Sequence, residues 1–120
     1  MSYKLQSICD RRTFAALKAT KFSARHGLVR AFFADSGEET NPRIAFAVSK
    51  KVGNSVERNR IRRRIRAAVT SNLDQLAPGN YLIIPGSGVL DASFNELKQD
   101  VLESMKRSSQ KAAGLELTNG

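Results

Sequence analysis

The side chains with the greatest capacity for chemistry in this sequence are six arginines that lie between residues 58 and 66. Together with Lys50 and Lys51 they are opposed by a single acidic residue, Glu57, so residues 50–66 carry a net charge of +7. Guanidinium groups clamp phosphate through paired hydrogen bonds, and crowded arginines repel one another unless an anion offsets their charge. The segment therefore predicts a surface that binds a polyanion.

The spacing of these residues favours a helix with a phosphate-binding face. Arg58, Arg62 and Arg66 recur every four residues, which places them in one row along a helix with a pitch of about 6 Å. Asn59 can hydrogen-bond a base edge, a ribose hydroxyl or a phosphate. Nucleic acid is therefore the class of ligand that the row predicts.

The other reactive side chains do not form an active site. His26 is the only histidine, and Cys9 is the only cysteine, so no internal disulfide can form. An autonomous nuclease needs a general acid and base or a carboxylate cluster that holds a metal. The acids that could serve are expected on helix and turn surfaces: Asp74, Asp91, Glu96, Asp100 and Glu103. The sequence therefore predicts no catalytic residue and no metal site in the protein itself.

Length and composition indicate one globular domain, residues 1–120. Hydrophobic residues make up 41% and charged residues 26% of the 120 residues, which argues against a disordered chain. The net charge is +9 and the sequence pI is about 10.3. No apolar run could span a bilayer, and the first residues do not form a secretory signal. We therefore expect a cytoplasmic protein that binds nucleic acid and no membrane.

Hydrophobic periodicity predicts the elements that precede the basic run. Residues 11–19 are expected to form a short helix capped by Asp10 or Ser7, and residues 21–34 a hairpin that turns at His26-Gly27. An exposed loop is expected over residues 35–42. Residues 43–49 alternate between large side chains, which we expect to face a core, and small ones that leave room for a shallow groove: Ala45, Ala47 and Ser49.

The basic helix is expected to begin after Gly53-Asn54, because Asn54 and Glu57 have the spacing of a capping box. Its apolar stripe runs through residues 55–73, and a short buried strand that stops at Pro85 follows. Ser93 is expected to cap a second amphipathic helix that ends near residue 109, before a mobile tail over 110–120. The resulting order, αβββαβα, predicts a single α+β domain with a four-stranded sheet packed by helices and an ordered core of residues 8–109.

Two kinds of residue need an interpretation of their own. The phenylalanines in apolar patterns are expected in the core rather than stacked on bases: Phe32, Phe33, Phe46 and Phe94. Phe14 is as well suited to stacking as to packing, because its short helix offers few apolar partners. Gly53 is expected to adopt a positive φ in the turn before the basic helix.

The run S-K-K-V-G-N-S-V-E-R-N-R-I-R-R-R-I-R, residues 49–66, resembles the signature of the bacterial ribonuclease P protein family, with Arg58-Asn59-Arg60 at its centre. The order of elements from about Phe14 to Ser109 is also similar to that family. The resemblance implies a fold like ribosomal protein S5 domain 2, with a left-handed βαβ crossover. It further implies an accessory subunit without an active site, whose partner RNA removes the 5′ leader of precursor tRNA with Mg²⁺ held mainly by that RNA.

The resemblance also implies roles for individual residues. The signature assigns RNA contact to the following: Lys50, Lys51, Gly53, Asn54, Arg58, Asn59, Arg60, Arg62, Arg63 and Arg66. A cleft for the leader, between the first helix and the sheet, is assigned to Phe14, Ala47, Ser49 and Phe33. The implied partners are the catalytic RNA and precursor tRNA, with a monomeric protein in a 1:1 complex. Two positions depart from the family, since Lys18 and Ala31 stand where aromatic residues are common.

Other classes of protein share part of this pattern. A structural RNA-binding protein of ribosomal type would have the same charge and could have the same fold, and composition does not separate the two. A helix-turn-helix DNA-binding domain is disfavoured because the basic helix follows a strand. An amphipathic membrane binder is disfavoured because that helix has only aliphatic residues opposite its arginines.

Overall fold

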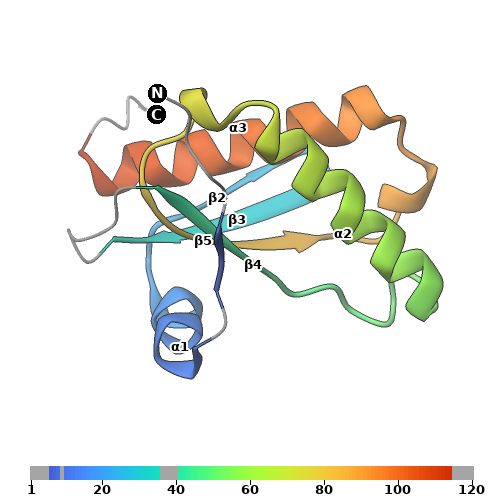
Figure 1. The fold of residues 1–120 in the computed structure, drawn as a ribbon, viewed down its shortest axis with the longest axis horizontal. Helices are drawn as coiled ribbons and strands as arrows, with labels where there is room; N and C mark the ends of the chain where they lie inside the picture. The colour runs from blue at the N-terminus through green and yellow to red at the C-terminus, as the bar shows by residue number, and fades with distance from the viewer. Residues whose placement is uncertain (1–5, 9, 36–40, 115–120) are drawn as a thin grey trace.

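Within the described residues, a five-stranded sheet organises the chain and has helices on both faces (Figure 1). The computed structural model describes residues 6–8, 10–35 and 41–114. The strands are β1 (Gln6–Ser7), β2 (Ser23–His26), β3 (Val29–Ala34), β4 (Pro42–Phe46) and β5 (Gly79–Pro85). The helices are α1 (Arg11–Ala19), α2 (Ser55–Thr70) and α3 (Phe94–Ala112), with 3₁₀ turns at Leu73–Gln75 and Val89–Asp91. The predicted α+β domain and its order of elements are confirmed, and β1 adds a two-residue strand that the sequence did not predict.

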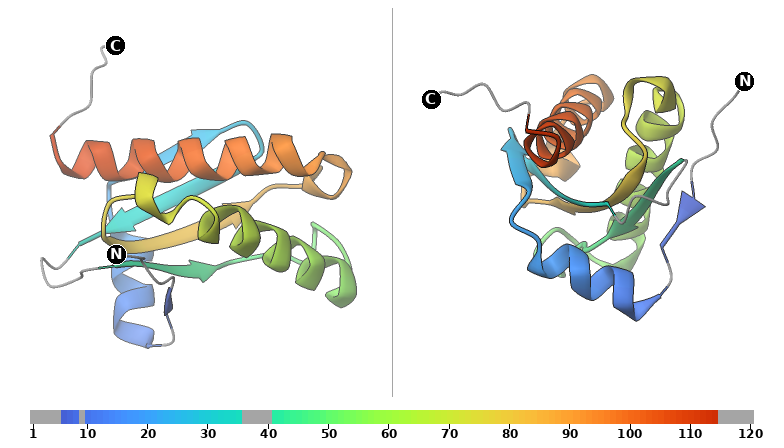
Figure 2. Two further views of the ribbon diagram at one scale, coloured as in Figure 1. Left: turned by 45° about the horizontal axis from the view of Figure 1, so that its top comes forward. Right: turned by 90° about the vertical axis from the view of Figure 1, so that its left-hand side faces the viewer.

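The strands lie in the order β1-β4-β5-β3-β2. β4 and β5 are parallel, whereas β3 pairs antiparallel with both β5 and β2. Parallel neighbours need a crossover connection, and here it runs through α2. In the left panel of Figure 2, α2 lies toward the viewer, β4 and β5 both run from left to right, and β5 lies above β4. This crossover is therefore left-handed, as the family resemblance implies and against the usual rule.

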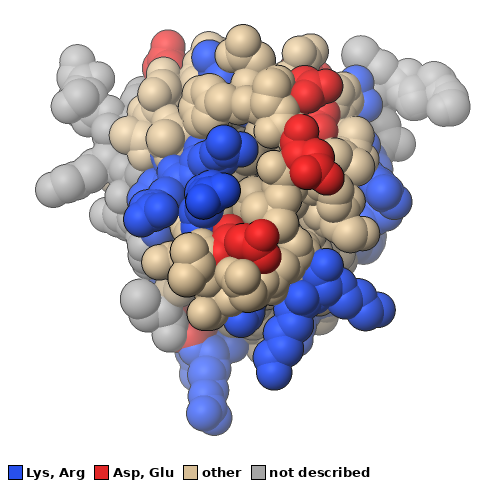
Figure 3. All heavy atoms as spheres, turned by 90° about the vertical axis from the view of Figure 1, so that its right-hand side faces the viewer, with Lys and Arg blue, Asp and Glu red and all other residues tan. Residues whose placement is uncertain are grey.

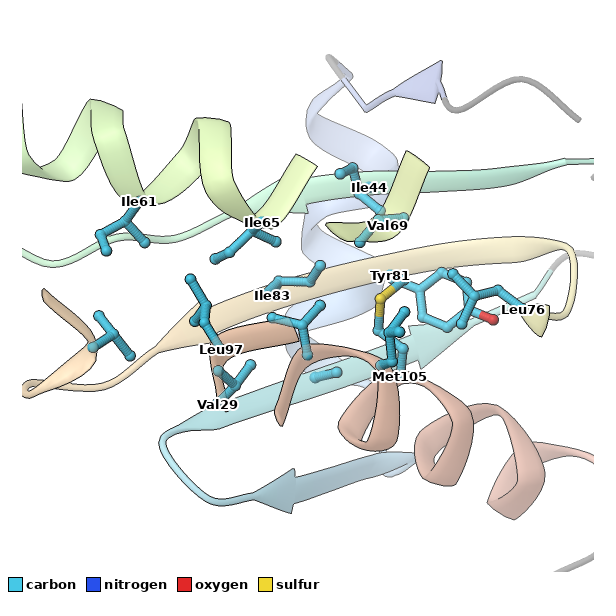
Figure 4. Close-up of a cluster of buried hydrophobic side chains, with 14 of the residues drawn as sticks. Val29, Ile44, Ile61, Ile65, Val69, Leu76, Tyr81, Ile83, Leu97 and Met105 are labelled. Carbon is cyan, nitrogen blue, oxygen red and sulfur yellow. The ribbon is translucent and has the colours of Figure 1, made fainter. Parts of the chain in front are cut away.

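The two faces of the sheet are covered differently, as the right panel of Figure 2 shows, with α2 and α3 on one face and α1 on the other. The larger core lies under α2 and α3, where Ile61 and Ile65 of α2 meet Leu97 and Met105 of α3 over the sheet (Figure 4). Under α1 there is a smaller buried cluster: Leu17, Ala45 and Leu82. The first face therefore carries most of the hydrophobic burial that stabilises the fold.

Side-chain caps fix the start of each helix at the positions that the sequence predicts. The Asp10 carboxylate accepts a hydrogen bond from the Thr13 backbone N–H (2.9 Å), so Asp10 rather than Ser7 caps α1. α2 and α3 each begin with a capping box, formed by Asn54 with Glu57 and by Ser93 with Glu96. A capping box satisfies two otherwise unpaired N–H groups, so the starting point of the arginine-rich helix is set locally.

Several boundaries differ from those predicted. β4 ends at Phe46, so residues 47–49 belong to a loop, and α2 ends at Thr70 instead of residue 73. The hairpin loop is Gly27-Leu28, one residue later than predicted, because His26 pairs with Val29. α3 continues to Ala112, where Lys111 Nζ donates to the Ser23 carbonyl (2.8 Å) and ties the last turn to β2. Residues 36–40 of the predicted loop and 115–120 of the predicted tail lie outside the described residues.

One aromatic residue does not lie where the periodicity placed it. Phe94 is 41% exposed, so its predicted place in the core is wrong. It occupies the first position of α3, directly after the Ser93 cap, and the first side chain of that helix to be buried is Leu97. Phe33 is buried, with its ring packed edge-on against Tyr81 at 4.9 Å between centroids.

Candidate nucleic-acid interface

The loop between β4 and α2 is a compact turn that presents two lysines. The Ser49 hydroxyl accepts a hydrogen bond from the Lys51 N–H (3.0 Å), and the Ser49 carbonyl accepts one from the Val52 N–H (3.0 Å). Val52 is buried beneath the turn, whereas Lys50 and Lys51 are exposed. The turn therefore holds both ammonium groups in solvent immediately before the helix.

Gly53 has a different reason to be glycine from the one the sequence suggested. Its φ is not positive, so the expected left-handed conformation is wrong. A Cβ at this position would lie 2.7 Å from Oε1 of Glu57 and 3.0 Å from Cδ1 of Leu90. The glycine instead allows the turn to pass close to the capping carboxylate of α2 and to the 3₁₀ turn before α3.

The arginines of α2 lie outside because its apolar stripe lies inside. Its buried residues are Ile61, Ile65, Ala68 and Val69, spaced so that they all point at the sheet and α3. The side chains predicted to contact RNA cover the remaining surface of the helix. We call this set the arginine surface: Arg58, Arg60, Arg62, Arg63 and Arg66.

Most of the arginine surface is not neutralised by the protein. In the described part of the chain, four of these arginines form no ion pair: Arg58, Arg60, Arg62 and Arg63. The side chains of Arg60 and Arg63 are exposed, and those of Arg58 and Arg62 are half-buried. The Nε atom of Arg58 is buried with no hydrogen-bond partner among these residues. A guanidinium group carries five N–H donors, and a buried donor without a partner is costly. The accessible donors of these four guanidinium groups are therefore free to bind an external anion.

Two other arginines of α2 contact the protein itself. The guanidinium carbon of Arg66 lies 5.7 Å from the centre of the Phe46 ring, a cation–π distance. Arg64, which the sequence did not assign to RNA, donates from Nη1 to the Ala92 carbonyl (3.4 Å). Arg64 thus ties α2 to the start of α3, and Arg66 lies toward β4.

The largest group of acidic side chains lies apart from these cations. Figure 3 shows the end of the molecule at which α2 and α3 begin, with a group of Lys and Arg side chains on the left and the largest group of acidic side chains at the upper right. Asp91, Glu96 and Asp100 line a hollow of about 560 Å³ beside His26. Apart from Glu57, which belongs to the capping box of α2, this separation leaves most of the positive field of α2 unscreened by the described acidic residues, which favours a polyanion there.

A second hollow, of about 260 Å³, lies against α1. It is lined by Ile8, Asp10, Arg11, Phe14, Ala15 and Lys18. The Lys18 ammonium lies 5.5 Å from the centre of the Phe14 ring, a cation–π distance. Lys18, which stands at a position where the family commonly has an aromatic residue, therefore covers the Phe14 ring. Phe14 is only half-buried and packs against the cluster of Leu17, Ala45 and Leu82. An aromatic ring, a cation and an apolar floor are therefore brought together at this helix.

The other residues predicted for the leader cleft do not all reach this side of the sheet. Ala47 does, because it packs against the cluster under α1. Ser49 is exposed three residues beyond the end of β4, where its hydroxyl holds the turn. Phe33 is 3% exposed in the core under α3, so it cannot line the predicted cleft.

Phe32 is the aromatic residue of β3 that sequence reasoning missed. It packs partly buried against the cluster under α1, whereas its neighbours Ala31 and Phe33 point into the larger core. A signal was present in the sequence, because Arg30 must face solvent and the period of two puts Phe32 on its side of the strand. Ala31, which stands at a position where the family commonly has an aromatic residue, is fully buried.

Several of the other polar side chains in the described ranges form contacts that hold the fold together. Asp100 accepts from the Leu28 N–H (3.1 Å) and lies 3.1 Å from Nδ1 of His26, which fastens the hairpin turn to α3. Burial raises the pKa of Tyr81, whose hydroxyl donates to the Ala77 carbonyl (2.6 Å). Among the described residues no group of three or more His, Cys, Asp or Glu side chains could hold a metal ion. Nor does any described helix have the length and apolarity needed to cross a membrane.

Comparisons with known proteins agree on one family. The family model described as Ribonuclease P matches residues 3–109. The "Ribonuclease P protein component" of Bacillus cereus is 40% identical over 78 residues, which cover 64% of this chain and 68% of the relative. The RNase P protein of Staphylococcus aureus superposes with a TM-score of 0.75 at 21% identity, covering 86% of this chain and 94% of that one. That of Thermotoga maritima gives 0.74 at 22% identity, covering 85% and 96%. The two superpositions show the fold.

Proposed function

This chain belongs to the ribonuclease P protein family, and from that premise we propose that its arginine surface binds the catalytic RNA while the α1 side of the sheet receives the 5′ leader. As a member of the family, the chain is the protein component of ribonuclease P, the endoribonuclease that produces the mature 5′ end of tRNA. It is an accessory subunit, and its partners are the ribonuclease P RNA and precursor tRNA. The proposal concerns which residues meet which RNA.

The observation that carries the proposal is the set of arginines on α2 that lack an acidic partner. Arg58, Arg60, Arg62 and Arg63 form no ion pair with the described residues, and Lys50 and Lys51 extend the same charge into the preceding turn. A folded RNA offers closely spaced phosphates to such a rigid array, and binding releases counterions from the RNA. Because the capping box and Gly53 fix the start of α2, the array is formed before the RNA binds.

The leader is assigned to the other side of the sheet. A single-stranded leader has unstacked bases, and proteins bind such strands by stacking on aromatic rings beside a positive groove. The half-buried side chains of Phe14, Phe32 and Ala47 supply an apolar floor under α1. Lys18 and Arg11 supply the charge at its edge. We therefore replace Phe33 by Phe32 in the proposed cleft.

The Mg²⁺ ions of the reaction are proposed to be held mainly by the partner RNA. This assignment is supported by two observations: no group of three or more acidic, His or Cys side chains among the described residues could hold a metal ion, and the arginine surface repels divalent cations. We therefore assign none of the described residues to catalysis. Its role is to hold the two RNA molecules and to neutralise their mutual repulsion.

We propose a 1:1 complex of a monomeric protein with the RNA, acting in the cytoplasm. The larger core is complete within one chain, so no second copy is needed to cover the apolar faces of α2 and α3. Light scattering of the protein alone and with the RNA would measure the stoichiometry, and a complex with two proteins per RNA would contradict the proposal.

A cleavage assay tests the proposed function. The purified chain is mixed with a bacterial ribonuclease P RNA and labelled precursor tRNA at low Mg²⁺, where repulsion between the RNAs is strongest. The proposal predicts that the protein accelerates cleavage by the RNA and that the protein alone does not cleave. Cleavage by protein alone would indicate a true nuclease. If the protein binds RNA but does not accelerate cleavage, a structural RNA-binding protein of ribosomal type would be the better interpretation.

A further inference from the structure

The face of the sheet under α1 continues beyond that helix as a row of residues that crosses β2, β3 and β5 and ends at the residue after β4. The strand register places Arg25 of β2 opposite Arg30 of β3, and Arg30 opposite Ile84 of β5. Ala47 lies directly after the end of β4; it follows Phe46, which is opposite Ile83, and its N–H donates to the Ile83 carbonyl (3.1 Å). The row therefore runs Arg25, Arg30, Ile84, Ala47, from the edge of the sheet to the proposed leader cleft.

All four side chains of the row point to the α1 side. Alternation along β3 sends Val29, Ala31 and Phe33 into the larger core, which leaves Arg30 and Phe32 on the opposite face. On β2, His26 lies against Asp100 of α3, so its neighbour Arg25 points away from that helix. Ile84 and Ala47 pack half-buried against the cluster under α1, whereas both arginines are exposed.

The backbone holds the two arginines as a close cross-strand pair. The Phe33 N–H donates to the Phe22 carbonyl (2.8 Å), which makes that pair a hydrogen-bonded one. Hydrogen-bonded and non-hydrogen-bonded pairs alternate along a hairpin, so Arg25 and Arg30 form a non-hydrogen-bonded pair, the closer kind, with Cα atoms about 4.5 Å apart. Like charges directly opposite each other destabilise a hairpin. A fold gains nothing from this pair unless an anion binds between the two guanidinium groups.

The protein does not supply that anion within the described residues. Arg25 Nε donates to the Gly27 carbonyl (3.2 Å), and Arg30 Nη1 donates to the Ser23 hydroxyl (3.4 Å). Both acceptors are neutral, and neither arginine forms an ion pair in the described ranges. Each bond uses one of five N–H donors, so it orients the guanidinium and leaves the other donors for a ligand.

We propose that Arg25 and Arg30 form a phosphate clamp for single-stranded RNA, namely the part of the leader that leaves the α1 cleft along this row. This inference rests on the proposed leader cleft and extends it to the hairpin edge of the sheet. Ile84 and Ala47 give an apolar floor for sugar and base, and the arginine pair neutralises the backbone phosphates where the floor ends. The positive charge of the pair fits the phosphates of a nucleic-acid backbone. Because the row Arg25, Arg30, Ile84, Ala47 contains no aromatic side chain on which bases could stack, we expect little preference for base sequence.

The test compares the wild-type holoenzyme with the double variant Arg25→Gln/Arg30→Gln. Three affinities are measured: that of the holoenzyme for a precursor tRNA with a long leader, that of the holoenzyme for the same tRNA without a leader, and that of the protein for the ribonuclease P RNA. We expect the double variant to bind the long-leader precursor about tenfold more weakly and the other two RNAs unchanged. Lys98→Gln/Arg107→Gln on α3 removes the same charge from the opposite side of the sheet and should change none of the three.

Two further measurements make the outcome decisive. The variant Arg25→Lys/Arg30→Lys should keep most of the affinity for the long-leader precursor, because the charge is kept. The melting temperature of the Gln variant should not fall below that of the wild type, because a repulsive pair is removed. An unchanged long-leader affinity overturns the clamp, and so does an equal loss for the leaderless tRNA or for the RNA subunit. If the wild-type enzyme itself does not distinguish precursor from leaderless tRNA, the proposed leader cleft fails and the clamp fails with it.

Discussion

The two faces of the sheet differ in how completely they are covered. On the side of α2 and α3, side chains such as Ile61, Ile83 and Met105 are fully buried in one continuous core. On the side of α1, the buried hydrophobic cluster of the described residues consists of Leu17, Ala45 and Leu82, and the rings of Phe14 and Phe32 stay partly open. The same strands thus support stability on one face and a binding surface on the other. α2 belongs to both tasks, because its inner stripe builds the core and its outer surface carries the arginines.

The largest effect should come from adjacent residues of β5 that point to opposite faces. We expect Ile83→Ala to lower the free energy of unfolding by about 3–4 kcal/mol, because a cavity in the closed core cannot collapse. Leu82→Ala should cost about 2 kcal/mol, because only α1 covers it, and should also weaken binding of the leader. Urea unfolding and leader affinity are measured on both variants. A larger loss of stability for Leu82→Ala than for Ile83→Ala would contradict the difference proposed between the two faces of the sheet.

The hairpin anchor on α3 should be the next most sensitive point. Gly27 has a φ of +58°, and a Cβ there would lie 2.4 Å from the Asp100 carboxylate that holds the hairpin turn. We expect Gly27→Ala to cost about 2–3 kcal/mol through strain and loss of the anchor. Gly88→Ala is the matched control, since Gly88 also has a positive φ (+99°) but its Cβ would meet only Leu28 carbons at 3.7 Å and beyond. Equal losses in chemical denaturation would show that Asp100 contributes nothing to the anchor.

A single arginine of α2 should separate binding from stability. Arg62→Ala is expected to weaken binding to the ribonuclease P RNA by about 1–2 kcal/mol, the size of a charge-assisted hydrogen bond. Its melting temperature should stay near that of the wild type, because Arg62 forms no ion pair with the described residues. Arg107→Ala, an exposed arginine of α3 paired with Glu103, is the control for charge alone. A sharp fall in melting temperature would instead make Arg62 a structural residue.

The smallest effect concerns the start of α1. Hydrogen bonds from the Thr13 hydroxyl and then from the Thr13 N–H lower the pKa of Asp10 below its ordinary value of 3.8. A lowered folded-state pKa stabilises the protein above pH 3.8, and this contribution is lost as the pH falls through the folded-state value. Asp10→Asn keeps a cap but cannot titrate, so its melting temperature should fall less than that of the wild type below pH 4. Parallel pH profiles for the two proteins would contradict the assignment.

The closed side of the molecule was predictable because its signals are local. Asn54 and Glu57 mark the start of α2 by themselves, and the spacing of Ile61 and Ile65 defines the buried stripe. The resulting position of the arginines on the outside of the helix follows from the helical period alone. For the same reason the capping box of α3 was found at Ser93, although the exposure of Phe94 was not.

The open side was less predictable because it depends on register and on distant contacts. Arg30 and the period of two indicate that Phe32 rather than Phe33 lies on the outer face of β3, but only the packing of α1 on the sheet shows that this face forms the proposed cleft. That Arg25 lies opposite Arg30 can be predicted only once the hairpin loop is known to be Gly27-Leu28, because the loop sets the register of the two strands. The reason for Gly53 involves Leu90, which the fold brings beside it from a distant part of the chain.

The salt dependence of binding to the ribonuclease P RNA tests most directly whether the outer surface of α2 serves RNA rather than the fold. Phosphate contacts release counterions, so the logarithm of the affinity should fall linearly with the logarithm of salt concentration, with a slope of several units. Arg62→Ala should reduce that slope by about one unit while its unfolding curve stays unchanged. A nearly flat titration of the wild-type protein, or an unchanged slope with loss of stability in the variant, would contradict the account.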